Sequence, residues 1–483
     1  MNNEKDKNNL PEKWEISNLG EICSDPQYGW TTKASTKGDL FFLRTTDITS
    51  GRINWDQVPF CDIEPNEKEK YILHHGDIVI SRAGSVGFSY LIKNPPKAIF
   101  ASYLIRFKPK IDEKYVAFYL KSSSYWETIV EKKIGIAIPN VNASKLKQIR
   151  IPIPPKNEQC RIVEKIEELF TKLDAGMVTL EKVRAQLKRY RQAVLKAAFS
   201  GELTAEWRQK HSNVGAGSSR PLVASPTSET DEGANTAPLP NADIPDLPAG
   251  WEWTSITKLG EINRGKSKHR PRDDVKLFGG KYPFIQTGDV KNSKGLITKY
   301  SQTYNDFGLQ QSQLWPVNTL CITIAANIAD TAILGIEACF PDSVVGFIAN
   351  EEKCLIKFIH YYFKTIKDRL ESFAPATAQK NINLAILKNI SVPLPTIEEQ
   401  HQIVSEIERR FSVADEVEKT VENALKQAKR LRQSILKMAF EGRLVPQDPN
   451  DEPAEKLLAR IKKQKEEMAQ VKKQKGRKND LQS

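Results

Sequence analysis

Two long stretches of this chain repeat apolar residues in steps of three and four, and they predict two long helices. The first runs from Pro152 to Leu203 and the second from Pro393 to Leu444, and a constant offset of 241 aligns them without a gap. Charged residues surround the apolar positions, a pattern typical of coiled coils. Because neither helix can bury its apolar stripe alone, we expect the two to pack together. The predicted stripes are Ile162, Ile166, Leu169, Leu173, Gly176, Leu180, Val183, Leu187, Tyr190, Val194 and Ala197, and Ile403, Ile407, Arg410, Ala414, Val417, Val421, Ala424, Ala428, Leu431, Ile435 and Met438.

Residues typical of helix ends lie on both sides of each stripe. Pro152 and Pro154 precede the first helix, and Gly201 and Gly442 stand where glycine ends a helix in a left-handed conformation. At 1.5 Å per residue, each apolar stripe predicts a helix roughly 50 Å long.

About 130 residues precede each long helix, and they predict short strands and turns rather than further long helices. The opening Leu10–Ile22 returns as Leu247–Ile262, so the repeat includes these regions as well. Each half is therefore predicted to be a mixed α/β globule followed by a long helix. The predicted strands are Phe41–Arg44, Asp77–Arg82, Ala98–Pro109, Phe284–Asp289, Leu320–Ala325 and Ala332–Phe340, and the predicted helices are Tyr115–Glu131 and Phe358–Ser372.

The predicted fold class is α+β, with two mixed α/β domains, two long helices in an antiparallel coiled coil and a pseudo-twofold internal repeat. Gly, Ser, Pro and Thr dominate the segment between the halves, which predicts a flexible linker. The predicted layout is a disordered start (1–9), a first α/β domain (10–151), a central helical spacer (152–203), the linker (204–246), a second α/β domain (247–392), a distal helical spacer (393–444) and a basic tail that begins as a helix (445–483).

Composition narrows the class of protein. The chain has 483 residues, a net charge of +12 and a pI near 9.1, which favours a polyanionic partner such as nucleic acid. It contains no apolar run of about 18 residues, as a membrane span requires, and its polar start lacks the core of a signal peptide, so we expect a cytoplasmic protein without a membrane segment. The six cysteines are scattered without a CxxC pair, which predicts neither a zinc knuckle nor a disulfide framework.

Three short strings resemble catalytic motifs, and each lacks the context that its chemistry needs. Gly260–Ser267 matches the phosphate-loop string, but the basic segment 268–272 follows it instead of an apolar helix. Pro341-Asp342 followed by Glu351-Glu352-Lys353 has the spacing of a metal-dependent nuclease core, without an equivalent in the first half. Asn94-Pro95-Pro96-Lys97 resembles an amino-methyltransferase motif in which lysine replaces the stacking aromatic residue. The sequence therefore predicts no catalytic residue and no metal site.

Basic and amide side chains remain as candidates for DNA contact. Asparagine can pair with adenine, arginine and lysine can pair with guanine, and basic side chains can bind phosphates. Asn140 and Asn142 correspond by position to Asn381 and Asn383, and a basic run opens the second half. The candidates are Arg44, Arg82, Lys132, Lys133, Asn140, Asn142, Lys266, Lys268, Arg270, Arg272, Lys380, Asn381 and Asn383.

The opening LPxxWxxxxLGEI, the IPxPPxxEQ lead into the helix, the KRxRQAVLKAAFSGELTxEWR end and the twofold recurrence resemble the DNA-specificity subunit of type I restriction–modification enzymes. The resemblance covers nearly the whole chain outside 1–9, 210–246 and the far tail. It implies two target-recognition domains, each of which reads half of a bipartite, asymmetric site in double-stranded DNA, and two conserved helical regions as spacer and docking platform. The base contacts of the family vary, so the candidates above rest on side-chain chemistry alone.

The resemblance also implies partners. Two methyltransferase subunits and two ATP-driven restriction subunits would join this chain, and AdoMet, ATP and Mg²⁺ would belong to them, so that this chain binds no cofactor. Two alternatives stay open: an enzyme that acts alone, as a nuclease or methyltransferase, and a coiled-coil scaffold that does not touch nucleic acid. Nine Lys or Arg against two Glu in residues 460–478 leave the tail as either a solvated end or a further phosphate contact.

Overall fold

The computed structural model describes residues 10–133, 140–212, 246–372 and 382–480. The chain forms two compact units. Unit 1 comprises 1–181 and 422–483, and unit 2 comprises 182–421. Each unit combines one α/β region, which we call head 1 (10–153) and head 2 (246–394), with parts of the two long helices α7 (Lys156–Phe199) and α14 (Ile397–Phe440).

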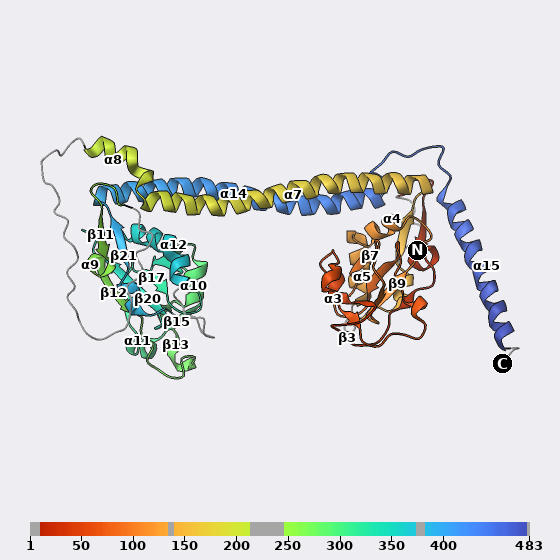
Figure 1. The fold of residues 1–483 in the computed structure, drawn as a ribbon, viewed down its shortest axis with the longest axis horizontal. Coiled ribbons are helices and arrows are strands. Elements are labelled where there is room, and N and C mark those ends of the chain that lie inside the picture. Colours follow the sequence, from red (N-terminus) through yellow and green to blue (C-terminus); the bar gives the residue numbers. More distant parts are fainter. Residues whose placement is uncertain (1–9, 134–139, 213–245, 373–381, 481–483) are drawn as a thin grey trace. The chain divides into compact units, whose positions relative to one another are not determined.

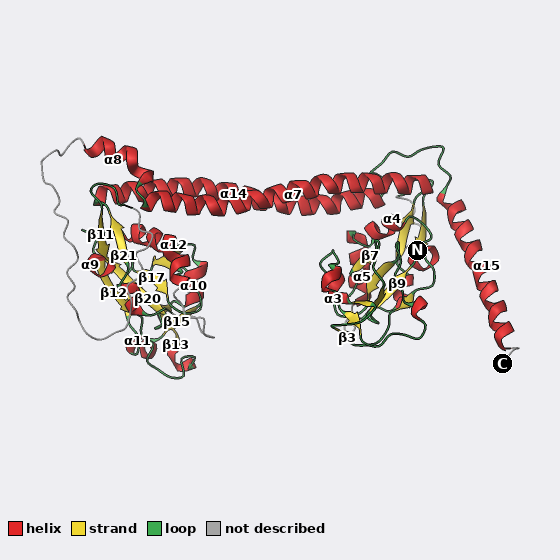
Figure 2. Ribbon diagram, viewed as in Figure 1, coloured by secondary structure: helices red, strands yellow, loops and turns green. Residues whose placement is uncertain are grey.

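Head 1 contains three sheets. β1 pairs with β10, and two four-stranded sheets have the orders β2-β9-β6-β7 and β3-β5-β4-β8. Figure 2 shows strands in yellow and helices in red. All four residues of β6 are buried, because one face packs on helices and the other on the second sheet. The elements are β1 (Glu15–Asn18), α2 (Leu19–Ile22), β2 (Gln27–Tyr28), β3 (Ala34–Ser35), β4 (Phe41–Leu43), α3 (Thr45–Ile48), β5 (Phe60–Cys61), β6 (Ile78–Ser81), β7 (Ser89–Leu91), β8 (Ala98–Phe100), β9 (Leu104–Phe107), α4 (Glu113–Tyr119), α5 (Ser123–Lys133), α6 (Ala143–Lys147) and β10 (Arg150–Ile153).

Head 2 repeats this plan with one additional strand. β11 pairs with β21, a five-stranded sheet has the order β12-β20-β17-β18-β14, and a four-stranded sheet has the order β15-β13-β19-β16. The elements are β11 (Glu252–Ser255), α9 (Ile256–Leu259), β12 (Gly260–Arg264), β13 (Phe278–Phe284), α10 (Thr287–Asn292), β14 (Leu296–Ile297), β15 (Gln302–Tyr304), α11 (Asp306–Gln310), β16 (Leu314–Trp315), β17 (Leu320–Thr323), β18 (Thr331–Leu334), β19 (Ala338–Cys339), β20 (Val344–Ala349), α12 (Ile356–Ser372), α13 (Leu384–Lys388) and β21 (Ser391–Leu394).

Matching hydrogen bonds occur within the two heads and between each head and the long helix that follows it. The hydroxyl groups of Tyr119 and Tyr362 donate at 2.6 Å to the carbonyl oxygens of Arg150 and Ser391, which begin the last strand of each head. The Gln159 amide donates to Pro154 O at 3.0 Å, as Gln400 donates to Pro395 O at 3.1 Å. Trp14 and Trp251 donate their indole N–H groups to Glu158 (3.1 Å) and Glu399 (2.9 Å). The repeated sequence motifs thus make the same contacts in both units.

In unit 1 the first part of α7 and the last part of α14 lie side by side (Figure 1). Ile162 and Ile166 of α7 share a buried core with Ile435 and Ala439 of α14. Further along α7, Asp174 forms an ion pair with Arg432 of α14. Because rising numbers on α7 meet falling numbers on α14, the two segments run in opposite directions within this unit.

Unit 2 shows the reciprocal contacts. Val194 and Ala198 of α7 share a core with Ile403 and Ile407 of α14. Arg191 forms ion pairs with Asp415 (2.5 Å) and Glu418 (2.9 Å). Each head therefore packs on both long helices within its own unit.

The predicted apolar stripes are wrong at several positions along the helices. Tyr190, Val417 and Leu431 are 40%, 39% and 47% exposed, and Gly176 is exposed as well. The residues that follow the first three, Arg191, Glu418 and Arg432, are less exposed and form ion pairs between the helices. A straight α-helix with 3.6 residues per turn drifts against a 3.5-residue repeat, which shifts the contact position by one residue over several turns.

Most predicted elements are present with shifted bounds. The long helices extend to 44 residues each, and Gly201 (φ 76°) and Gly442 (φ 70°) follow their ends in the left-handed conformation, as predicted. The predicted helix over 115–131 is two helices, α4 and α5, separated at 120–122, and residues 287–289 form the start of α10 instead of a strand. The predicted disordered start, most of the linker and two loop segments lie outside the described residues. Among those described, no helix is long and apolar enough to cross a membrane.

A further helix follows each long helix and packs on the unit in which that long helix ends. In unit 1, α15 (Ala454–Asp480) begins where the tail was predicted to be helical, and the Lys465 ammonium donates to the carbonyl oxygens of Gly20 (2.7 Å) and Cys23 (2.7 Å) at the end of α2. In unit 2, α8 (Ala205–Ser212) carries Arg208, which forms a 2.6 Å ion pair with Glu399. Lysine thus satisfies carbonyl groups that the end of α2 leaves open.

The fold of unit 2 contains one buried histidine that makes its stability depend on pH. His360 of α12 is 4% exposed, and its Nδ1 lies 3.0 Å from Oγ1 of Thr331. Burial, followed by the charge of Lys364, lowers the pKa of His360 from 6.5 to about 3. Between these pH values the unfolded chain binds a proton that the folded unit does not bind. We therefore expect His360 to lower the free energy of unfolding of unit 2 by about 1.4 kcal/mol for each pH unit below 6.5.

Denaturant unfolding between pH 7 and pH 4, followed by hydrogen exchange in each unit, checks this expectation. His360→Gln should reduce the loss of stability of unit 2 on acidification and leave unit 1 unchanged. Unit 1 serves as an internal reference, because it has Ala117 at the position equivalent to His360. Both residues lie three positions after a lysine, Lys114 or Lys357, that donates to a glutamate of the following long helix. Equal pH dependence of unit 2 in the original and substituted chains would show that His360 is not responsible.

Candidate nucleic-acid interface

The turn after β4 carries the candidate Arg44 in an oriented position. Arg44 precedes the short helix α3, and its backbone N–H donates to Oδ2 of Asp47 at 2.8 Å. The guanidinium also donates to Asp47, from Nε to Oδ2 at 3.1 Å and from Nη2 to Oδ1 at 2.8 Å. This hydrogen bonding raises the pKa of Arg44, and the side chain remains 40% exposed. Asp47 thus fixes the orientation of the Arg44 guanidinium, which remains accessible as a hydrogen-bond donor.

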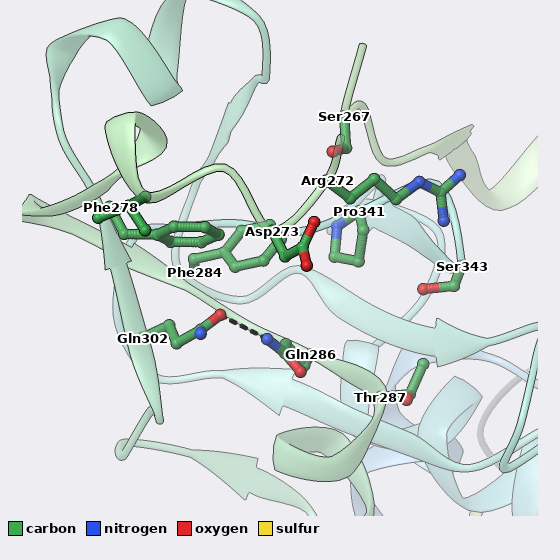
Figure 3. A pocket seen from close by; sticks show the side chains of 11 residues that line it. Ser267, Arg272, Asp273, Phe278, Phe284, Gln286, Thr287, Gln302, Pro341 and Ser343 are labelled. Atoms are coloured by element: carbon green, nitrogen blue, oxygen red, sulfur yellow. Dashed lines mark hydrogen bonds between the residues drawn. The ribbon is translucent and has the colours of Figure 1, made fainter. Parts of the chain in front are cut away.

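The equivalent turn of head 2 carries Gln286, which the sequence analysis missed. Gln286 follows β13 and precedes α10, and its backbone N–H donates to Oδ2 of Asp289 at 2.9 Å. Its side-chain Nε2 donates to Oε1 of Gln302 at 2.5 Å (Figure 3). The strings FLRTTDI and FIQTGDV align at an offset of 242, the same offset that aligns residues 76–80 with 318–322. That alignment was the available signal, because it places Gln286 opposite Arg44.

Gln286 faces a pocket of about 530 Å³ in head 2 (Figure 3). Phe278 and Phe284 form an apolar wall, and Phe284 stacks on Tyr304 with ring centroids 4.0 Å apart. Arg272 stands on another side and donates to Oδ2 of Asp342 at 2.7 Å. The pocket therefore combines amide groups, a guanidinium and aromatic rings, the side-chain types that contact bases and phosphates.

The basic run of head 2 divides into exposed lysines and tethered arginines. Lys266 and Lys268 are exposed. Arg270 donates from Nη1 to the carbonyl oxygens of Ser267 (2.7 Å) and His269 (2.8 Å). The structure thus brings Lys266, Lys268, Arg270 and Arg272 onto one segment that leads to the pocket.

In head 1 the structure brings Arg82 and Asn140 together. Ala83 pairs with Asn140 in an isolated bridge, and Val141 N donates to Arg82 O at 3.0 Å. The Arg82 guanidinium lies over the Tyr28 ring, 5.2 Å from its centroid. Within the described part of the chain, Nε of Arg82 and Oδ1 of Asn140 are buried without a hydrogen-bond partner.

The remaining candidates are less informative. Asn142 and Asn383 directly precede α6 and α13. Their side-chain oxygens accept hydrogen bonds from the backbone N–H groups of Lys145 (2.9 Å) and Ile386 (2.8 Å), so these asparagines serve as helix N-caps. Lys132 and Lys133 end α5, but their side chains are not described. Lys380 and Asn381 lie outside the described residues.

Corresponding loops of the two heads keep one backbone shape with different residues. Gly84 (φ 71°) and Gly87 (φ 90°) of head 1 correspond to Ala326 (φ 64°) and Ala329 (φ 58°) of head 2. A hydroxyl anchors each loop: Ser81 donates to Ser85 O, and Thr323 donates to Asn327 O. The left-handed conformation is costly for alanine and not for glycine.

The structure describes the surroundings of two of the strings that resemble catalytic motifs. Gly260–Arg264 of the phosphate-loop string form β12, which pairs with β20, so the string is not a loop before a helix. Asp342 of the nuclease-like string pairs with Arg272. Among the described residues, no group of three or more His, Cys, Asp or Glu side chains is placed to hold a metal ion.

The family model for the type I restriction modification DNA specificity domain matches residues 11–184 and 248–427. The StySPI specificity subunit of Salmonella potsdam is 27% identical over 425 residues, 84% of this chain and 83% of that protein. The EcoKI specificity subunit of Escherichia coli (strain K12) is 26% identical over 456 residues, 91% and 90% of the two chains.

Two solved structures share the fold. A chain from a structure concerned with complex assembly and conformational transition of the type I R-M system has a TM-score of 0.67 and 18% identity, and the match covers 90% of this chain and 99% of that one. The HsdS subunit from Thermoanaerobacter tengcongensis has a TM-score of 0.52 and 17% identity, with coverage of 90% and 98%.

Proposed function

We propose, from the premise that this chain belongs to the type I restriction–modification DNA specificity family, that each head reads one half of a bipartite, asymmetric site in double-stranded DNA. The family match confirms the resemblance inferred from the sequence and the assignment of the chain as a specificity subunit rather than an enzyme that acts alone. The alternative of a scaffold without a nucleic-acid partner is disfavoured for the same reason.

One observation carries the proposal of two half-sites. The heads share strand order and anchoring contacts, yet their exposed polar residues differ at equivalent positions, such as Arg44 and Gln286. Two similar frames with different donor and acceptor groups select different bases, because each base pair presents its own pattern in the major groove. An asymmetric site follows from unlike heads in one chain.

We further propose that α7 and α14 form an antiparallel coiled coil related by a pseudo-twofold repeat, that it sets the spacing between the half-sites, and that it docks the partners. Opposite direction within each unit and the reciprocal pairs Arg191–Asp415 and Arg432–Asp174 support this arrangement. The proposed partners are two methyltransferase and two restriction subunits, which would bring AdoMet, ATP and Mg²⁺ to a cytoplasmic complex on DNA.

A heptad insertion tests the role of the helices. Seven residues added to both α7 and α14, after Glu181 and Val421, lengthen each helix by roughly 10 Å. At 3.4 Å per base pair, the non-specific spacer should grow by about three base pairs while both half-sites stay the same. The spacer is measured by methylation mapping of DNA from host cells that express the chain together with its methyltransferase partner.

The same seven residues inserted within 213–245 provide the matched control and should leave the methylated site unchanged. An unchanged spacer in the variant with insertions in both α7 and α14 would refute the spacing proposal. A wild-type complex that methylates without a bipartite sequence motif would refute the proposed function itself.

A further inference from the structure

We propose that Arg44 and Gln286 are corresponding base-reading residues, with Arg44 selecting guanine in one half-site and Gln286 selecting adenine in the other. The inference rests on the proposed function and deepens it, because it names one base that each head requires.

The two residues occupy the same place in the shared frame. Each follows a strand that pairs in parallel with another strand of its sheet, β4 with β8 and β13 with β19. Each also begins a short helix whose third residue, Asp47 or Asp289, accepts the backbone N–H of Arg44 (2.8 Å) or Gln286 (2.9 Å). The backbone thus presents both side chains in the same way, and only their chemistry differs.

Asp47 orients Arg44 for one type of contact. It accepts one N–H from Nε and one from Nη2, at 3.1 and 2.8 Å, and among the described residues no other side chain or carbonyl oxygen accepts from the Nη1 and Nη2 end of the guanidinium. Two parallel N–H groups at that end match N7 and O6 of guanine, the commonest specific arginine contact in the major groove. Holding the side chain in place also reduces the entropy that binding would otherwise cost.

Gln302 orients Gln286 in a comparable way. The 2.5 Å hydrogen bond uses one N–H of the Gln286 amide and leaves its oxygen and second N–H available. An amide oxygen and N–H side by side match N6 and N7 of adenine. Gln286 lines the open pocket of Figure 3 with Arg272, whose positive charge favours an approaching phosphate backbone.

Exchange of the two side chains tests the assignment. Both substitutions should be tolerated, because arginine and glutamine already occupy equivalent turns in the two heads. Arg44→Gln should change the preferred base from guanine to adenine at one position of one half-site, and Gln286→Arg should make the opposite change in the other half-site. Methylation mapping with the methyltransferase partner should show a loss of about 10- to 100-fold at the original sites, in keeping with one lost bidentate contact. The unaltered half-site should stay the same in both variants.

Charge controls separate base reading from phosphate contact. Arg52→Gln in head 1 and Arg264→Gln in head 2 remove exposed positive charges outside the candidate interface, so they should keep the original bases. Lower methylation by Arg44→Gln or Gln286→Arg with unchanged base preference would overturn the proposal, as would an unchanged site at unchanged efficiency. Either result would leave the proposed function intact. If the wild-type complex methylates DNA without a sequence motif, both the base-reading assignment and the proposed function are refuted.

Discussion

Phe440→Ala is expected to lower the free energy of unfolding of unit 1 by about 3–5 kcal/mol. Phe440 ends α14, is 6% exposed, and meets the rings of Tyr115 and Tyr119 edge to face, with centroids 5.3 and 5.0 Å apart. Both tyrosine hydroxyls donate to β10, to Pro152 O at 2.7 Å and Arg150 O at 2.6 Å. The phenyl ring therefore connects α14 with the strand that leads into α7, and its removal leaves a cavity where head and helices meet.

The chain contains a matched control for this prediction. Phe199 ends α7 and packs in unit 2 against Phe358 and Tyr362, with ring centroids 5.1 and 5.3 Å apart. Hydrogen exchange under mild denaturant should show that Phe440→Ala loosens unit 1 and Phe199→Ala loosens unit 2. A loss of about 0.5 kcal/mol or less, the range of an ordinary surface substitution, would contradict the assigned packing.

Arg208→Met is expected to destabilise unit 2 by about 3 kcal/mol, because it leaves a buried carboxylate without its counter-charge. Glu399 is 3% exposed and accepts from Arg208 Nη1 (2.6 Å), Thr204 Oγ1 (2.7 Å) and Trp251 Nε1 (2.9 Å). Methionine keeps most of the apolar length of arginine, so the effect reports on charge more than on lost packing.

Unfolding of the double variant Arg208→Met/Glu399→Gln separates the two contributions. A neutral amide at position 399 removes the stranded charge and still accepts from Thr204 or Trp251, so it should restore most of the lost stability. Equal destabilisation in the single and double variants would assign the effect to packing of α8. In unit 1, Glu158 accepts from Trp14 and from Gln447 (2.7 Å) instead of an arginine, and burial raises its pKa.

The long helices were predictable from the sequence because their apolar periodicity extends over many turns and left-handed glycines follow their ends. Val417 and Leu431 were placed on the contact face and are exposed, because ion pairs of Arg191 and Arg432 occupy the neighbouring positions. Where apolar burial is small, charged contacts decide which residue faces the partner helix, and an apolar pattern does not contain that information.

The candidate interface was predictable in composition but not in arrangement. Arg44, Arg82 and the run 266–272 were recognised by side-chain chemistry. Asp47, which orients Arg44, lies only three residues away, but Tyr28 and Asp342, which contact Arg82 and Arg272, are brought near by the tertiary structure. Asn142 and Asn383 illustrate the opposite case, because a residue type suited to adenine is equally suited to cap a helix. Gln286 was missed because the amide candidates were taken only from the asparagines that recur before each long helix, and position 286 was not compared with Arg44.

The left-handed alanines of head 2 have a consequence for how such a chain can change over time. Ala326 and Ala329 adopt a backbone conformation that their own side chains disfavour by roughly 1–2 kcal/mol each, so the surroundings, including Thr323, impose it. We therefore expect substitutions in this loop to change the atoms that it exposes while its backbone conformation stays the same. A protein built in this way can acquire a new preference for DNA sequence through a few substitutions while the surfaces that assemble it stay untouched.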